Sequence, residues 1–347
     1  MKRILFVVLT GILFSLFVSS LASAEMVEVK VGKGTLKIGG ILQAGFTFHV
    51  EDDEGMNAFT LNRARFLFWG DIVPDKVKYF VQTETNGTPS ILDYKAQFFY
   101  IPKTEIAVGR FLPNFTLYMP VSTALLEMIN YPLTTQRFAV WRQVGIQTTT
   151  KTDYVDFNLG IFNGYPANNF SDDNDAKDLL LRADVHPSVE QAKLLFGGYA
   201  WIGSASPGWG LSPEEGTLKR NRFGGFAKVD YKATDDVTLK FRGEFLVATS
   251  DYLYDNHIDS VSTTDAQAFF FHFGVQPIPQ VELLARYDFH DPDTDVDDDA
   301  ESWFTAGVNY YLEGINSMFY LNYIHKMEQG VVNVGNDLMV AQVQITF

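Results

Sequence analysis

The sequence contains no cysteine, so no disulfide bond can stabilise its fold in an oxidising compartment. After its N-terminal segment it has no run of 18 consecutive apolar residues, which excludes a membrane-spanning helix in the rest of the chain. It also lacks G-x-S-x-G, H-E-x-x-H and a glycine-rich phosphate loop, and its six histidines have no recognisable partner set. These absences argue against a disulfide-linked secreted scaffold and against an enzyme.

Basic residues are scarce. The 27 Lys and Arg against 42 Asp and Glu give a formal net charge of -15, which disfavours nucleic acid as a partner. The acidic residues cluster in four stretches without a strand pattern, at 51–54, 172–178, 251–259 and 291–301. We interpret these stretches as solvated loops, so the net charge does not describe the strands.

The first 24 residues have the pattern of a cleaved export signal. Lys2 and Arg3 precede an apolar core at 4–21, and the small residues at 22–24 form a cleavage site. Cleavage would remove two positive charges, change the net charge to -17, and leave residues 25–347 as a single domain exported through the inner membrane. A membrane-anchoring helix is the alternative, but the apolar run is barely long enough to span a bilayer.

Aromatic residues are abundant although the mean hydropathy is only -0.02. They make up 15% of the chain, with 30 Phe and 16 Tyr. A transmembrane β-barrel has this composition, because apolar side chains face lipid and polar ones face the lumen. Only helices and closed barrels satisfy the backbone within lipid. We therefore predict an all-β, antiparallel transmembrane barrel located in the cell outer membrane.

Alternation and turn residues predict about 16 strands. The expected spans are 35–49, 57–71, 75–86, 91–101, 104–110, 138–151, 153–164, 177–186, 191–204, 217–231, 236–250, 264–276, 280–290, 301–312, 316–327 and 337–347. Short and long connections alternate between them, as in bacterial barrels with tight periplasmic turns and long external loops. An even strand number places both chain ends on the periplasmic side, and a barrel of this size leaves an aqueous channel.

Selectivity residues are expected on the inward faces of the strands. Phe66 and Phe68 would face lipid, which directs Arg63 and Arg65 into the lumen. The same argument predicts a pore lining made of Arg63, Arg65, Lys76, Lys78, Arg220, Arg222, Lys240, Arg242 and Arg286. These residues belong to strands about half a barrel apart, so we expect two basic walls that face each other. Such walls would concentrate anions in the pore.

Four segments resemble a known family. They are Leu61-Asn-Arg-Ala-Arg65, the stretch 77–84, Ala107-Val-Gly-Arg-Phe-Leu-Pro113 and the terminal Phe347. Together they resemble the phosphate-selective porins of the O and P type. The resemblance implies a 16-stranded homotrimer whose third external loop folds into the lumen, and residues 111–137 occupy that position.

Within this candidate constriction loop the residues singled out are Phe115, Tyr118, Glu127 and Arg137. A helical turn is expected at 125–129. The terminal Phe347 is interpreted as the assembly signal for the barrel-assembly machinery.

The function expected from these features is an outer-membrane porin for passive diffusion of small hydrophilic solutes and ions. It would prefer anions, with phosphate and other small oxyanions as candidate solutes, and need no cofactor. The partners expected are the lipid bilayer, lipopolysaccharide and small anionic or neutral solutes. A general porin without anion preference, a plugged barrel that serves as adhesin or anchor, and an outer-membrane enzyme remain as alternatives.

One acidic stretch resembles the start of a calcium loop. Asp291, Asp293, Asp295 and Asp297 place oxygen ligands at alternate positions, but Val296 stands where an EF-hand turn requires glycine. A solvated loop that collects divalent ions, or bridges to lipopolysaccharide through them, is therefore favoured over a dedicated metal site.

Overall fold

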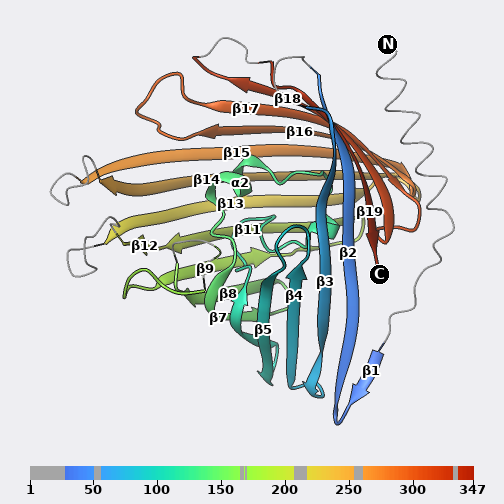
Figure 1. Cartoon of the computed structure of the whole chain (residues 1–347), viewed down its shortest axis with the longest axis vertical. Coiled ribbons are helices and arrows are strands. Elements are labelled where there is room, and N and C mark those ends of the chain that lie inside the picture. The colour runs from blue at the N-terminus through green and yellow to red at the C-terminus, as the bar shows by residue number, and fades with distance from the viewer. Residues whose placement is uncertain are drawn as a thin grey trace.

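The computed structural model describes residues 28–50, 56–164, 168, 170–206, 217–253, 261–330 and 335–347. Within them, sixteen long strands form one antiparallel sheet in which each long strand pairs with the next (Figure 1). The strands are β2 (Gly34–His49), β3 (Ala58–Val73), β4 (Val77–Glu84), β5 (Ser90–Ile101), β6 (Thr104–Phe111), β7 (Gln143–Lys151), β8 (Val155–Phe162), β9 (Asp178–Val185), β11 (Ala192–Ile202), β13 (Leu218–Lys232), β14 (Thr238–Leu253), β15 (Val261–Ile278), β16 (Val281–Asp291), β17 (Glu301–Tyr311), β18 (Ser317–Glu328) and β19 (Leu338–Thr346).

The sheet closes into a barrel because the last strand pairs with the first long one. Gln342 of β19 lies opposite Gly45 of β2, and the terminal Phe347 exchanges backbone hydrogen bonds with Gly40. Two short strands were not expected: β1 (Glu28–Val31) beside β2 and β10 (Ser188–Val189) beside β11. The predicted span 191–204 is divided into β11 and a short strand β12 (Ser204–Ala205), and both pair with β13. The predicted closed antiparallel barrel of 16 strands is confirmed.

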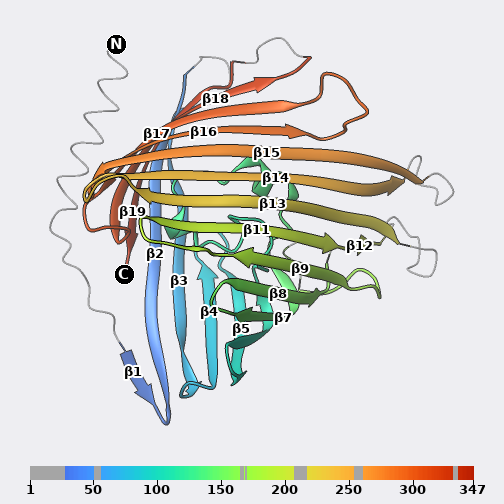
Figure 2. The same ribbon diagram turned by 180° about the vertical axis from the view of Figure 1, so that it is seen from behind.

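The two rims of the barrel differ in their connections. One rim carries short links such as 74–76, 102–103 and 279–280, and the other carries long segments such as 112–142 and 292–300. The end of β19 lies beside the first half of β2 at the short-link rim, as both views show (Figures 1 and 2). The predicted signal segment 1–24, the acidic stretch 51–54 and residues 254–259 of another acidic stretch lie outside the described residues.

The strands have an inside-out burial pattern. In β16 the charged Glu282, Arg286 and Asp288 are buried, whereas Leu283 and Tyr287 are exposed. In β8 the exposed positions are likewise apolar and alternate with buried ones. A water-soluble sheet would bury its apolar face, so this alternation fits a barrel with a lipid-facing exterior and a polar interior.

The position at which β7 begins corrects one expectation. The span 138–151 was predicted as strand, but β7 begins at Gln143, and helix α2 (Leu133–Phe138) precedes it. Pro132 stands just before the helix, at a place where proline is tolerated because the first N–H groups of a helix have no helical partner. The helical turn expected at 125–129 is instead a 3-10 turn, η1 (Thr123–Leu125), capped by Ser122. No helix in the described part of the chain is long and apolar enough to cross a membrane.

Gly109 explains one of the family-like segments. It lies in β6 with φ of 132°, a conformation that L side chains rarely adopt, and a Cβ there would collide with the carbonyl oxygen of Tyr94 on β5. Glycine is therefore required at this position, two residues before β6 ends and the segment 112–142 begins.

We expect Gly109→Ala to destabilise the barrel by about 2 kcal/mol, because the substitution combines backbone strain with a collision against backbone. Urea unfolding of the protein in lipid vesicles measures this loss. Gly198→Ala is the matched control, since its added Cβ meets only ordinary contact at 3.9 Å. Equal stability of the two variants would contradict the assignment.

Candidate functional site

Residues 112–142 lie inside the barrel, between the β2–β6 wall and the long β13–β18 strands (Figure 1). Their apolar side chains form one buried cluster with inward residues of β6, β8, β9, β11 and β13–β15. The Phe115 ring, which is fully buried, packs edge-on against Tyr199 and Trp201 with centroids 4.9 and 5.6 Å apart. Much of the lumen beside β11–β15 is therefore filled with protein.

Glu244 of β14 holds both ends of this segment. Its carboxylate accepts hydrogen bonds from the Leu117 backbone N–H at 2.6 Å, from the Thr134 hydroxyl at 2.7 Å and from the Tyr199 hydroxyl at 2.9 Å. A buried carboxylate with three donors is well compensated. The loop is thus fixed to the wall rather than laid loosely across the lumen.

The middle of the segment is held by β16 and its neighbours. Asp288 accepts from the Leu133 backbone N–H at 3.0 Å, and Arg286 donates to the Asn130 carbonyl at 3.0 Å. Further wall-to-loop bonds join Asn309 to Glu127, Asn322 to Ile129, Tyr320 to Leu126, and Gln344 to Ala124. These bonds come from four consecutive strands, so the loop follows the wall closely.

Glu127 forms a charged contact between the loop and β14. Its carboxylate pairs with Arg242 at 2.7 Å and accepts from the Tyr118 hydroxyl at 2.7 Å. Burial alone would raise the pKa of Glu127, but the attraction of Arg242 and His272 outweighs it and lowers the pKa to about 2. Glu127 is therefore ionised at neutral pH, and its negative charge is paired with Arg242 of the wall.

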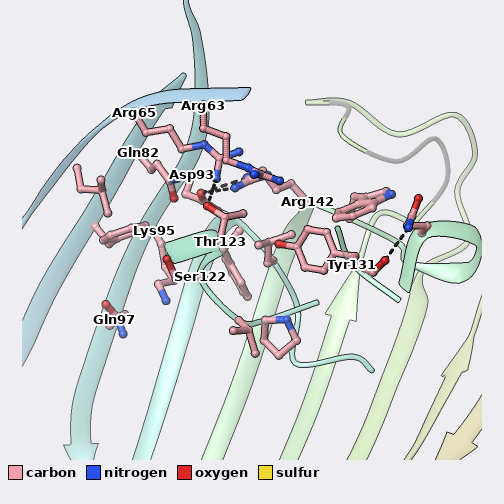
Figure 3. A pocket seen from close by; sticks show the side chains of 18 of the residues that line it. Arg63, Arg65, Gln82, Asp93, Lys95, Gln97, Ser122, Thr123, Tyr131 and Arg142 are labelled. Carbon is pink, nitrogen blue, oxygen red and sulfur yellow. Dashed lines mark hydrogen bonds and ion pairs between the residues drawn. The ribbon is translucent and has the colours of Figure 1, made fainter. Parts of the chain in front are cut away.

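The free space lies on the opposite side of the loop. A cavity of about 670 Å³, here named the main opening, lies between the loop and the β3–β6 wall. Its lining consists of Arg63, Arg65, Leu67, Phe80, Gln82, Asp93, Lys95, Gln97, Phe111, Leu112, Pro120, Val121, Ser122, Thr123, Asn130, Tyr131, Gln136, Trp141 and Arg142. Figure 3 shows side chains of the strands and of the loop converging on this space.

Two cations of the main opening have no acidic partner among the described residues. Arg63 donates to the Gln43 side chain at 2.7 Å, a neutral acceptor. The Lys95 ammonium lies 5.8 Å from the ring centre of Phe80 and 5.6 Å from that of Phe111. Their positive charges are therefore directed at the space rather than neutralised.

Two other cations are held by acids. Arg142 forms an ion pair with Asp93 at 3.0 Å, and Arg65 pairs with Glu84 at 2.8 Å while also donating to Thr123 of the loop. With its amide nitrogen toward Asp93, Gln82 donates to Asp93 at 3.0 Å and accepts from Arg65 at 3.3 Å. This network fixes the arginines against the wall.

Strand irregularities help to aim these groups. The pairing of β2 with β3 skips Asn62, next to Arg63, and the pairing of β4 with β5 skips Leu92, next to Asp93. A β-bulge re-aims side chains and is common near functional sites. Asn62 also points inward, since its amide donates to Gln342 at 2.8 Å.

The lining of the main opening is strongly basic. Four of its side chains are Arg or Lys, and Asp93 is its one acid. A narrow space between low-dielectric walls focuses the field of such charges and raises the local concentration of anions. The arrangement can therefore attract anions and admit them to the lumen.

The structure brings only some of the predicted residues to this space. Arg63 and Arg65 line the main opening. Lys78 lines a second opening of about 380 Å³ near the short-link rim and lies 4.0 Å from Asp71. Lys76 is exposed in the turn between β3 and β4, with its ammonium 5.9 Å from the Tyr100 ring centre.

The residues of the predicted second basic wall do not line the main opening. Arg242 and Arg286 are only 2% and 3% exposed, because the loop covers them and Glu127, Asp230 and Asp288 pair with them. Lys240 forms an ion pair with the buried Glu282. Arg220 and Arg222 lie on β13 and are not among the residues that line the main opening. Alternation in the sequence predicts the strands of this wall but not the loop that covers Arg242 and Arg286.

The loop residues singled out from the sequence have different surroundings. Phe115 and Tyr118 are buried in the apolar cluster, and Glu127 contacts the wall. Arg137 instead forms a two-bond ion pair with Glu301, at the start of β17. Sequence reasoning missed Lys95, Asp93 and Arg142. The alternation of Asp93, Lys95 and Gln97 in β5 was a usable signal for the first two.

The acidic stretch after β16 does not assemble a metal site. Among the described residues, no group of three or more His, Cys, Asp or Glu side chains is arranged to hold a metal ion. Asp291, Asp293, Asp295 and Asp297 fall in this part of the chain, and Asp293 uses a carboxylate oxygen to accept from the backbone N–H of Asp295 at 3.1 Å.

The closed barrel with a loop folded into its lumen defines a porin-type fold. Residues 36–201 match the family model described as phosphate-selective porin O and P, so the resemblance predicted from the sequence motifs is confirmed over these residues. No curated protein sequence matches the chain.

Solved outer-membrane proteins share the fold at low identity. A loop L8 deletion mutant of OmpT, an outer membrane protein of Vibrio cholerae, superposes with a TM-score of 0.62 at 13% identity, covering 91% of this chain and 100% of that one. An anion-selective porin from Comamonas acidovorans gives 0.62 at 12% identity, covering 90% and 100%. The outer membrane channel DcaP of Acinetobacter baumannii gives 0.61 at 11% identity, covering 92% and 99%.

Proposed function

We propose that the chain forms a water-filled, anion-preferring porin in the outer membrane, for passive diffusion of small hydrophilic solutes. The observation that carries the proposal is the lining of the main opening, with four basic side chains against one acid. The loop narrows the lumen to the side of the β3–β6 wall, so solutes pass these cations. Phosphate and other small oxyanions belong to the solute class that such a lining admits.

The net charge of -15 does not oppose this selectivity. Charges on external loops act through water and salt, and the Debye length is only about 8 Å at physiological ionic strength. Charges on the lining act on an ion within the narrow space itself. The sign of the selectivity therefore follows the main opening rather than the whole chain.

The cellular setting belongs to the same proposal. Residues 1–24 would direct export and be removed, Phe347 would be read by the barrel-assembly machinery, and the exposed apolar side chains of the strands would contact lipid and lipopolysaccharide. A homotrimer is supported by the porin-type fold and by a trimer form of a structural neighbour, the OmpT protein of Vibrio cholerae.

The test is the reversal potential of purified protein in a planar bilayer under a KCl gradient. We expect stepwise conductance increases and a reversal potential of the sign given by chloride permeation. A potential near zero would favour a general porin without anion preference. A potential of cation sign would mean that acidic loops govern entry, and absence of conductance would favour a plugged adhesin or anchor, or an enzyme.

A further inference from the structure

The lining of the main opening is aromatic as well as basic. Phe80, Phe111, Tyr131 and Trp141 all contribute to it, beside the cations described above. A site for a small inorganic anion needs polar donors on every side and gains little from rings. Phosphate as the solute therefore does not account for the aromatic side chains in this lining.

Lys95 shows how charge and rings are combined. Its ammonium lies within 6 Å of two ring centres, those of Phe80 and Phe111, and forms no ion pair among the described residues. An anion bound to this ammonium would have its remaining atoms next to the two rings. An aromatic body in that place would bury apolar surface and pack against Phe80.

Trp141 adds a further ring to the lining and directly precedes the cation Arg142 in the chain. Its backbone has φ of 49°, the left-handed region, where a bulky residue is an outlier. The indole packs edge-on against Tyr131 at 5.5 Å, and the next residue, Arg142, is fixed by Asp93. Strain of this kind persists where the surrounding structure holds it, and it is common at binding sites.

The same combination continues toward the short-link rim. The second opening shares Leu67, Phe80 and Gln97 with the main opening, so the two are contiguous along the wall. Its other lining residues include Lys37 and Lys78, which pair with Glu28 and Asp71, and the aromatic residues Trp69 and Tyr79. Basic and aromatic side chains thus accompany a solute through both openings.

The donors available to phosphate are limited. Arg142 and Arg65 already donate to Asp93 and Glu84, which leaves Arg63 and Lys95 without an acidic partner among the described residues. A strongly hydrated phosphate ion would lose water next to aromatic rings without replacing those hydrogen bonds. A singly charged carboxylate on an aromatic ring matches both the cations and the rings.

From this juxtaposition we propose that the main opening binds and conducts small aromatic carboxylates in preference to inorganic phosphate. The inference rests on the proposed channel function and narrows its solute class. Each solute would place its carboxylate at Lys95 or Arg63 and its ring against Phe80 or Trp141.

The experiment measures block of the chloride current through the full-length mature protein in planar bilayers at pH 7. The probes are benzoate, acetate, cyclohexanecarboxylate and inorganic phosphate. We expect benzoate to reach half block at a concentration about tenfold below that of acetate, because ring packing adds to the same carboxylate contact. Cyclohexanecarboxylate should block less well than benzoate, and phosphate should need more than benzoate.

Substitution of the rings distinguishes their contribution to block from that of the positive charges. Phe80→Leu and Trp141→Leu should each raise the half-blocking concentration of benzoate severalfold toward that of acetate. Phe273→Leu is the matched control, because that ring is 57% exposed on the outer face, and it should change neither the benzoate block nor the KCl reversal potential.

Two results would overturn the inference while the channel proposal stands. One is an anion-selective channel that benzoate and acetate block equally, and the other is stronger block by phosphate than by benzoate. Equal block by cyclohexanecarboxylate and benzoate would overturn the aromatic assignment. A channel without anion preference in KCl would instead refute the proposed function on which the inference rests.

Discussion

Replacing both Arg63 and Lys95 with glutamate should change the channel from anion to cation preference. These are the two lining cations that have no acidic partner in the described part of the chain. Each replacement removes one positive charge and adds one negative charge, so the lining changes from three net positive charges to one net negative charge. The KCl reversal potential should therefore change sign, since the nearest charges set the barrier for an ion in a narrow pore.

The control carries the same change of net charge elsewhere. Lys76 and Lys232 are exposed at the short-link rim, and Lys76→Glu with Lys232→Glu should leave the sign of the potential unchanged. If both double variants shifted the potential equally, the selectivity would depend on overall charge and not on the main opening.

Replacing residues 116–130 with a glycine-serine linker of equal length should raise the single-channel conductance at least about twofold, because a 16-stranded barrel without its inner loop leaves a wide aqueous lumen. The linker cannot make the ion pair of Glu127 with Arg242 or the ring contact of Tyr118 with Phe270. The current should also become noisier, and Phe270, which is fully buried in the intact protein, would meet water. Single-channel recording measures both effects.

A linker in another loop tests whether the effect is specific. Residues 292–300 connect β16 and β17 at the long-segment rim, and a glycine-serine replacement there should leave conductance unchanged. Unchanged conductance after replacement of 116–130 would mean that this segment does not limit the current.

Strand positions could be predicted from the sequence because lipid and lumen impose opposite demands on successive residues. In β16 this gives the repeated pairing of an inward charge with an outward Leu or Tyr, and the predicted span 280–290 matches Val281–Asp291 closely. The start of β7 could not be predicted in this way. Residues 138–141 are apolar enough for a strand, but Phe138 ends helix α2, and contacts inside the barrel hold 139–142 in an irregular path that includes Trp141.

The candidate site could be predicted only on one wall. Arg63 and Arg65 follow from alternation within β3, and they line the main opening. Arg142 comes from an irregular segment, and its partner Asp93 follows a bulge, so no periodic pattern marks their proximity. The far wall was predicted as open because the contacts that close it, such as Leu117 with Glu244, join residues far apart in the chain.

The most direct test of the claim that ions pass through the main opening introduces a single cysteine, because the sequence has no other. Lys95→Cys introduces one thiol into the main opening, and it can be treated with charged thiol reagents while current is recorded. If ions pass this opening, modification will lower the current, a negatively charged reagent will react faster than a positive one, and Lys76→Cys at the exposed turn will react without lowering the current. A thiol at position 95 that reacts fully and leaves the current unchanged would contradict the account.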